Sequence, residues 1–357
     1  MRFLCLPGAY GSAKNFGVQL GPFAKHMEDR GLATFAFTQG AHEVDPPAGW
    51  ENYFGSRPLY RFIDGGRQGQ GDDPFEVVRR VRHIPRGLSP EATLRLFSKR
   101  PDGQQAADFD WTPFRDALDR LLRVVEDDPE IDGLIGYSEG AMMAACICAE
   151  ENRRWEEEGI PRRIKFAIFF AGTPPLVREG DGFVAKLADE HGTVIGIPTF
   201  HVFGSNDPLV YSSVALYNCC DPDAAQLYDH GLGHLVPRDA DNVEQLGDTL
   251  SDVITRINNE QQAAATATEN AAAAAAAAAA SKDDEPAVAV VAVAVANEYI
   301  TSSSSSSAES TTASGSSAPS SAASSAGSTT AESDLDSRSS HGLESEVVDG
   351  IAKIHLK

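Results

Sequence analysis

The chain has 357 residues, and its 52 acidic and 30 basic side chains give a formal net charge of −22 at pH 7. So acidic a composition argues against nucleic acid as a partner, because a nucleic-acid-binding face needs clustered lysine and arginine. An abrupt change in composition predicts one globular domain over residues 1–260 and a low-complexity tail rich in alanine and serine over residues 261–357.

The tail has few large apolar side chains that a folded core would bury. Its alanine run at 271–280 favours helix by propensity, but about ten residues is short for a stable isolated helix in water. The serine-rich tract at 301–340 cannot offset the entropy cost of ordering, and the Ala/Val stretch at 288–296 is too short to cross a bilayer. We therefore expect a largely disordered tail without a membrane anchor. The body then carries about −14, because residues 261–357 hold 12 acidic and 4 basic side chains.

The first segment of the body alternates strand and helix. Residues 2–6 form a short apolar run that predicts a buried strand, and a glycine-rich turn follows at 7–12. Apolar residues at helical spacing predict a helix over 13–31, and residues 32–38 predict a second strand. A strand, a helix and a strand in this order are typical of an α/β domain with parallel strands.

The N-terminus and the cysteines indicate the compartment. One basic residue and a short apolar run broken at Pro7 do not resemble a signal peptide. The five cysteines form no C-x-x-C pair, and small buried core residues are the simplest interpretation of Cys5, Cys146, Cys148, Cys219 and Cys220. We therefore expect a reducing, cytoplasmic setting.

Residues 42–100 are too long for a simple connection and predict an insertion between core elements. The insertion is rich in aromatic residues, namely Trp50, Tyr53, Phe54, Tyr60, Phe62 and Phe75. A long segment of this kind in an enzyme is often a lid or a binding wall, and an aromatic wall suits an apolar or polyaromatic acyl group. The same residues are equally compatible with a small local core, so both interpretations stay open.

Residues 131–140 hold the strongest motif of the chain. A short apolar strand runs into Gly136-Tyr137-Ser138-Glu139-Gly140, and small apolar residues continue as a helix to about 150. This is the G-x-S-x-G pattern of a nucleophile elbow, where a sharp strand-to-helix turn exposes one serine hydroxyl. Both flanking glycines are needed because a Cβ would collide within so tight a turn. The helix N-terminus adds partial positive charge where an oxyanion would form.

The remaining elements continue the alternation of strands and helices. An amphipathic helix at 111–127 precedes the elbow strand, and near-continuous apolar runs predict buried strands at 164–171 and 198–204. Residues 224–231 predict a last strand. Residues 239–258 predict a closing helix. Together these elements predict an α/β fold with a doubly wound, mostly parallel sheet.

The elbow serine predicts two partners elsewhere in the chain. A serine hydroxyl is a weak nucleophile until a base takes its proton, and that base needs a carboxylate to orient it. In the α/β-hydrolase fold these partners follow in the order serine, acid, histidine, each in a loop after a strand. Asp207 and His234 meet this demand, so we predict Ser138 as nucleophile, His234 as general base and then acid, and Asp207 as its orienter.

Three nearby residues are weaker candidates for the same roles. His230 lies inside the predicted last strand, and both Asp229 and Asp239 are too near His234 to occupy a separate loop. For the oxyanion, this fold uses the backbone N–H of the residue after the nucleophile and one from a loop after an early strand. Those donors are Glu139 and either Ala9 or Tyr10, of which Ala9 is preferred.

The motifs together resemble the fungal serine hydrolase family, which includes stand-alone thioesterases and esterases of polyketide biosynthetic clusters. The resemblance covers about residues 1–258 and rests on the segments that begin at Leu4, Gly136, Phe203 and Gly233. It implies an α/β-hydrolase with no metal and no organic cofactor, and it places the triad on the same three residues. One departure is Pro7-Gly8, where the family often has His-Gly after the first strand.

This resemblance implies an acyl hydrolase of secondary metabolism. The leading hypothesis is a thioesterase that releases a polyketide or similar acyl chain from a carrier-protein thioester through a Ser138 acyl-enzyme. The alternatives are a carboxylesterase acting on small free esters and an acyltransferase that uses the same acyl-enzyme. A non-catalytic binding module is the weakest hypothesis, because a complete triad serves no purpose there.

One basic cluster within the insertion suits an acyl-carrier protein as partner. Residues 75–86 predict a helix with an apolar inner stripe and an outer cluster of Arg79, Arg80, Arg82 and Arg86. Carrier proteins are generally acidic, and like charge slows their encounter with an acidic enzyme. A local basic cluster on the enzyme would offset this repulsion where the two proteins meet. A solvated helix face paired with acids at 72, 73 and 76 is the alternative interpretation.

Overall fold

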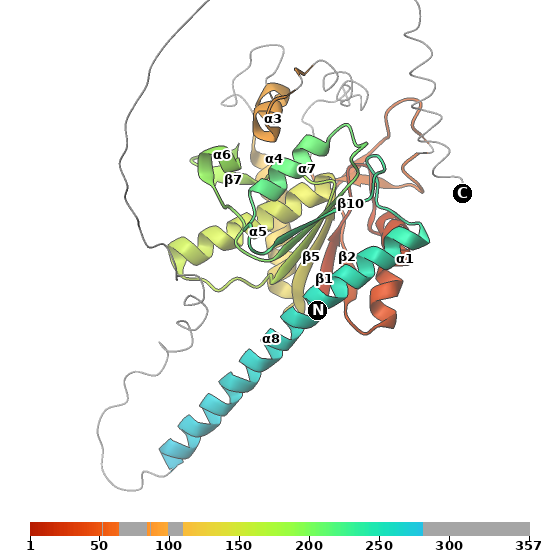
Figure 1. The fold of residues 1–357 in the computed structure, drawn as a ribbon. Coiled ribbons are helices and arrows are strands. Elements are labelled where there is room, and N and C mark those ends of the chain that lie inside the picture. The colour runs from red at the N-terminus through yellow and green to blue at the C-terminus, as the bar shows by residue number, and fades with distance from the viewer. Residues whose placement is uncertain (52, 64–83, 86, 99–109, 281–357) are drawn as a thin grey trace, which may run out of the picture. The chain divides into compact units, whose positions relative to one another are not determined.

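The computed structural model describes residues 1–280 except 52, 64–83, 86 and 99–109. Its centre is a six-stranded sheet in which every pair of neighbouring strands is parallel, in the order β10-β9-β6-β5-β1-β2. The strands are β1 Arg2–Leu6, β2 Thr34–Phe37, β5 Ile131–Tyr137, β6 Phe166–Phe170, β9 Thr199–Phe203 and β10 Ala225–Asp229. This sheet confirms the predicted α/β-hydrolase architecture (Figure 1).

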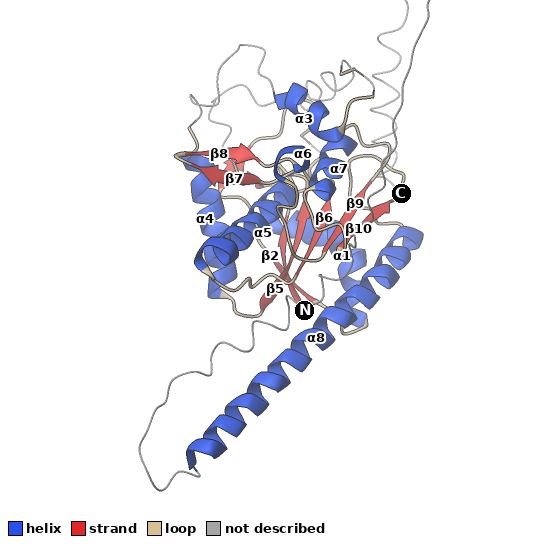
Figure 2. Ribbon diagram, turned by 60° about the vertical axis from the view of Figure 1, so that its left-hand side comes forward, coloured by secondary structure: helices blue, strands red, loops and turns tan. Residues whose placement is uncertain are grey.

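Helices cover both faces of the sheet because its strands are apolar on both sides. Along β1, Leu4 and Leu6 pack with α4 (Thr112–Asp127) and α5 (Glu139–Glu158), whereas Phe3 and Cys5 pack with the opposite layer. That opposite layer consists of α1 (Ala13–Asp29) and the first half of α8 (Ala240–Ala280). Figure 2 shows the sheet between these two pairs of helices. Full burial of each large apolar side chain contributes about 1.5–3 kcal/mol.

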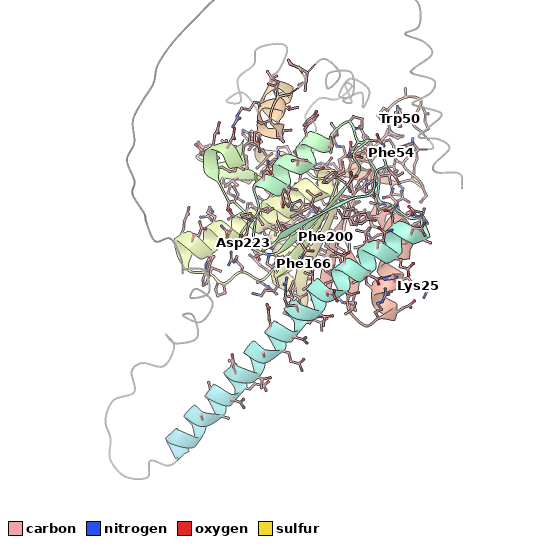
Figure 3. All side chains as sticks on the ribbon, in the orientation of Figure 1. Lys25, Trp50, Phe54, Phe166, Phe200 and Asp223 are labelled. Atoms are coloured by element: carbon pink, nitrogen blue, oxygen red, sulfur yellow. The ribbon has the colours of Figure 1, made fainter. Side chains whose placement is uncertain are left out.

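The middle strands are the most deeply buried part of the core. Every residue of β6 and of β9 is buried, as expected for parallel strands with helices on both sides. Phe166 of β6 and Phe200 of β9 belong to the layer that faces α1 and α8, and Figure 3 labels both. The five cysteines are free and buried, which confirms their predicted place in the core.

Two antiparallel hairpins and three short helices were not predicted. The hairpins are β3 (His42–Val44) with β4 (Leu59–Arg61), and β7 (Leu176–Glu179) with β8 (Gly182–Ala185). The helices are α3 (Pro90–Ser98), α6 (Ala188–His191) and α7 (Val210–Asn218). All of these lie outside the main sheet, where three- and four-residue strands leave little periodicity to read.

The described part of the insertion forms a small aromatic cluster beside the turn that follows β1. The rings of Trp50, Tyr53 and Phe54 contact one another, and the centroid of Phe54 lies 4.7 Å from that of Tyr10. Figure 3 labels Trp50 and Phe54 in this cluster. The contacts support the local-core interpretation for these rings, whereas the binding wall stays a hypothesis. Phe75 and the four arginines of the predicted basic helix lie outside the described residues.

Helix α8 extends further than predicted. It continues to Ala280, past both residue 258, where the closing helix was expected to end, and the expected domain boundary at 260. Extending an existing helix avoids the cost of nucleation, so the alanine run that is too short alone can continue α8. The domain boundary itself stays a prediction, and residues 281–357 lie outside the described part. No helix described here combines the length and the apolar character that a bilayer crossing requires.

We predict that truncation after Gln261 leaves the melting temperature and the expected ester hydrolysis nearly unchanged. The described side chains between residues 262 and 274 are exposed, so their removal takes nothing from the core. A matched truncation after Ser251 removes Val253, Ile254 and Ile257, which are buried, and should destabilise the domain severely. Thermal unfolding and ester hydrolysis are measured for both truncated proteins. If the protein truncated after Gln261 melted more than a few degrees below the full-length chain, the prediction would be wrong.

Candidate active site

The candidate site lies at one edge of the sheet. Because all six strands are parallel, their carboxyl ends meet at the same edge, and each candidate residue follows such an end. Ser138 follows β5 directly, Asp207 lies in the loop after β9, and His234 lies in the loop after β10. The topology therefore brings together residues that are up to 96 positions apart in the sequence.

Ser138 has the backbone conformation of a nucleophile elbow. Its φ of 53° and ψ of −115° lie in a region that L-residues rarely occupy, at a cost on the order of 1–3 kcal/mol. The Ser138 N–H donates to the Phe170 carbonyl at 2.9 Å, which ties the turn to the neighbouring strand β6. The turn projects the serine hydroxyl beyond the end of β5, toward the loops that follow β9 and β10.

The glycines on either side of Ser138 are required by close contacts. A Cβ on Gly140 would lie 2.2 Å from the Leu6 carbonyl oxygen and 2.4 Å from that of Pro7. A Cβ on Gly136 would lie 2.4 Å from the Ala141 Cα. Real Cβ atoms do not approach other atoms this closely, so neither position accepts a side chain without moving backbone. The elbow consequently lies against the end of β1 and the turn that follows it.

Ser138, His234 and Asp207 form one hydrogen-bonded chain. His234 Nε2 lies 3.0 Å from Ser138 Oγ, and His234 Nδ1 lies 2.7 Å from Asp207 Oδ2. A carboxylate only accepts hydrogen bonds, so the His234 proton belongs on Nδ1, and Nε2 is then free to accept from the serine hydroxyl. The Asp207 side chain is fully buried, and its Oδ1 accepts the Leu209 N–H at 2.8 Å. Both carboxylate oxygens thus have donors, as a buried charge requires.

Tyr137 holds His234 from the other side. Its hydroxyl donates to the His234 carbonyl oxygen at 2.9 Å, and its ring packs between Phe16 and the imidazole. Burial raises the pKa of Tyr137 well above its usual range, so the phenol stays protonated and remains a donor. Sequence reasoning missed this contact, because the residue before the serine in G-x-S-x-G is unrestricted in the motif.

The rival residues occupy other positions. His230 Nδ1 accepts the Leu232 N–H at 3.2 Å, and its buried Nε2 has no hydrogen-bond partner among the described residues. Burial lowers the pKa of His230, so it favours the neutral ring. Asp239 accepts the Asn242 N–H at the start of α8, which is a helix-capping contact. The geometry therefore favours His234 over His230 as the partner of Ser138.

The loops after β9 and β10 are joined to each other by hydrogen bonds. Asp229 Oδ1 accepts the N–H groups of both Ser205 and Gly231 at 2.8 Å. Asn206 donates its backbone N–H to the Leu232 carbonyl at 3.2 Å and its side-chain amide to the Gly231 carbonyl at 2.6 Å. Asp229, a rival for the acid role, thus has a positioning function between the two loops.

The turn after β1 lies against the elbow. A Cβ built on Gly8 would stand 3.3 Å from Ser138 Cβ, and the turn closes through the Gly11 N–H, which donates to the Gly8 carbonyl at 3.0 Å. Tyr10 within it has a positive φ of 60°. The first N–H groups of α5 lack an acceptor four residues earlier in the helix, so Glu139 has a backbone donor available. The assignment of the Glu139 and Ala9 N–H groups to an oxyanion stays a prediction.

Among the residues that the structure describes, no group of three or more histidine, cysteine, aspartate or glutamate side chains converges in a way that could hold an ion. The hydrogen-bonded chain of serine, histidine and aspartate can perform acyl transfer by itself.

Comparison with known proteins points to one family. The sequence model of the family described as "Serine hydrolase (FSH1)" matches residues 1–246. Esterase FPY3 of Fusarium mangiferae is 34% identical over 145 residues, which cover 39% of this chain and 64% of that esterase, less than two thirds of its length. Hydrolase phiM of Talaromyces stipitatus is 26% identical over 242 residues, covering 67% of this chain and 82% of that protein. The crystal structure of a Bacillus cereus carboxylesterase aligns with 71% of this chain and 88% of its own, at 18% identity and a TM-score of 0.36.

Proposed function

This chain belongs to the FSH1 family of serine hydrolases, and we propose that Ser138, His234 and Asp207 are the catalytic residues with which it hydrolyses ester or thioester bonds. The observation that carries the proposal is the position of His234, which contacts Ser138 Oγ at 3.0 Å and the buried Asp207 carboxylate at 2.7 Å. A histidine in both contacts at once can move a proton and stabilise the charge it then carries.

In the first half of the reaction, Ser138 Oγ attacks the acyl carbonyl carbon while its proton passes to His234 Nε2. The negative charge that forms on the carbonyl oxygen accepts hydrogen bonds from the backbone N–H groups of Glu139 and Ala9. When the tetrahedral intermediate collapses, the bond to the leaving thiol or alcohol breaks, and His234 gives its proton to that group. Asp207 remains a carboxylate throughout and stabilises the imidazolium.

In the second half, water replaces the leaving group. His234 Nε2 takes a proton from the water as its oxygen attacks the acyl-enzyme, and the released Ser138 oxygen then regains that proton from His234. The reaction needs no redox step and no cofactor. Its atoms and charges balance with the acyl substrate, water and these three side chains. An alcohol or amine in place of water would make the same site an acyltransferase.

For the substrate, we favour a polyketide or similar acyl chain carried as a thioester on an acyl-carrier protein. The aromatic cluster of Trp50, Tyr53 and Phe54 stands beside the turn that contacts Ser138, and it suits an apolar acyl group. A carboxylesterase acting on small free esters is the second candidate, and the esterase relative FPY3 favours it. The five free thiols support a reducing compartment such as the cytoplasm for either function.

A parallel assay separates these functions. Purified enzyme is incubated with an acyl-carrier-protein thioester, with a small free ester, and with either substrate plus an alcohol acceptor, and the products are identified by mass spectrometry. We expect free acid from the carrier thioester at a higher kcat/KM than from the free ester. Preference for the free ester would establish the second candidate, and an ester product with the alcohol would establish acyl transfer. The Ser138→Ala variant serves as the blank in every arm.

The arginines at 79, 80, 82 and 86 remain the proposed contact for the carrier protein. We predict that the double variant Arg79→Glu with Arg82→Glu has a higher KM for the carrier-bound thioester, with a larger increase at low salt. Its hydrolysis of a small free ester should be unchanged. The matched control is Lys25→Glu with Arg123→Glu, which makes the same change in net charge at exposed positions on other elements. Equal kinetics of the two double variants on both substrates would refute docking at this patch.

A further inference from the structure

The Glu139 side chain reaches away from its own helix. It is the first residue of α5, and its carboxylate is only 7% exposed. Oε1 accepts the backbone N–H groups of Phe62 at 2.7 Å and Ile63 at 3.1 Å, and Oε2 accepts Arg61 Nε at 3.0 Å. The residue that directly follows the nucleophile is therefore bonded to a segment 76–78 positions earlier in the chain.

This segment continues from β4, which in turn holds the turn after β1. The Tyr60 N–H donates to the Gly11 carbonyl at 3.2 Å, and Gly11 and Tyr60 form an antiparallel bridge. The Arg61 guanidinium lies over the Tyr10 ring, 5.7 Å from its centroid. Tyr10 and Gly11 are therefore each in contact with a residue of β4.

Residues 7–12 lie between β4 and the elbow. On one side Gly140 meets the carbonyls of Leu6 and Pro7 so closely that no side chain fits, and on the other side β4 pairs with Gly11. The Glu139 carboxylate adds a third connection, because it joins the outer end of β4 to the first turn of α5. The backbone groups of Ala9 and Glu139 thus belong to two segments whose separation this side chain helps to fix.

We propose that the Glu139 carboxylate is the positioning group of the oxyanion hole. By holding residues 61–63 against the start of α5, it sets where β4 and the turn at 7–12 stand relative to Ser138. This inference rests on the proposed function, since it assigns a role within the same acyl transfer. Displacement of one oxyanion donor should lower kcat far more than it changes KM, because the oxyanion exists only in the transition state.

A negative charge in the first turn of a helix has a general stabilising effect, which is the competing explanation for an acidic residue here. Two conservative variants separate the explanations. Glu139→Gln keeps an oxygen acceptor at the length needed for the N–H groups of Phe62 and Ile63. It removes the charge and, because its amide nitrogen only donates, the bond from Arg61 Nε. Glu139→Asp keeps the charge in the first turn of α5 but is one methylene too short to reach the same donors.

The experiment measures kcat and KM for a small ester, the rate of fluorophosphonate labelling, and the melting temperature of each variant. We expect Glu139→Asp to lose about 10- to 100-fold in kcat with KM changed less than about threefold, a smaller loss than the 10²–10³ that follows removal of a whole oxyanion donor. Glu139→Gln should retain kcat within about threefold of wild type. The control is Glu150→Gln on the same helix, a carboxylate that is 5% exposed, pairs with Arg153 and Arg154, and should change stability only.

The outcomes are distinguishable from failure of the proposed function. If wild-type protein neither hydrolyses esters nor reacts with the fluorophosphonate, the proposed function fails. If wild type is active and Glu139→Asp is as active as Glu139→Gln, the positioning role is wrong. Activity that is retained in Glu139→Asp and lost in Glu139→Gln would show that the charge at the helix start matters, and would equally overturn the proposal.

Discussion

Replacing Ser138 with alanine should lower kcat on the order of 10⁶-fold and abolish labelling by a fluorophosphonate probe. The Ser138 hydroxyl lies 3.0 Å from His234 Nε2, and loss of a triad serine typically has this effect. Ester hydrolysis by the purified variant and in-gel fluorescence of the probe measure the two results. A variant that keeps a tenth of wild-type activity would exclude Ser138 as the nucleophile.

The same substitution should leave the fold intact. The Ser138 hydroxyl has His234 as its partner, and alanine keeps the Cβ that serine already has, so the substitution adds no atom to the tight turn. The melting temperature should therefore stay within a few degrees of wild type. Ser251→Ala on α8, where the hydroxyl bonds to the Gly247 carbonyl, controls for the loss of a serine remote from the site and should retain full activity.

His234→Ala should be almost as inactive as Ser138→Ala, whereas Asp207→Asn should leave measurable turnover. Proton transfer has no substitute once the imidazole is gone, and single removal of a triad histidine costs about as much as removal of the serine. Asn at 207 keeps the shape of the side chain, but its amide is able to donate to Nδ1 and so favours the wrong tautomer. A loss of about 10⁴-fold in kcat is typical of that change.

His230→Ala is the control for this second prediction. His230 is buried beside the same loop, so its removal tests whether any imidazole near β10 is enough. We expect His230→Ala to lose stability but to keep a large part of kcat. An inactive His230→Ala beside an active His234→Ala would reverse the assignment of the general base.

Much of this architecture was predictable because buried parallel strands are apolar on both faces and therefore visible as short continuous runs. The strands at 164–171 and 198–204 were predicted within a few residues of β6 and β9, and the elbow motif identified the end of β5. Asp207 was identified because it follows the run at 198–204, and His234 because it follows the last predicted strand. The fold thus follows from local patterns, and the spacing of the three candidates follows from the fold.

The side-chain contacts around the site were not predictable in the same way. Glu139 bonds to residues 61–63, and Tyr137 bonds to the His234 carbonyl, across 76 to 97 positions of sequence. No periodicity of the sequence predicts a contact between segments this far apart, since only the assembled sheet decides which of them meet. The full length of α8 was missed for a different reason: the alanine run was considered alone, although it continues a helix that is already nucleated.

The hydrogen bonds that join the loops after β9 and β10 have a consequence for thermal motion. Because Asp229 and Asn206 connect these loops at three points, a fluctuation that displaces Asp207 carries His234 with it. The acid and the base then behave as one rigid body, and the 2.7 Å contact between them persists while the pair moves. The longer contact of the three residues, 3.0 Å between His234 Nε2 and Ser138 Oγ, is the one that must open and close as a proton crosses it in each half of the reaction.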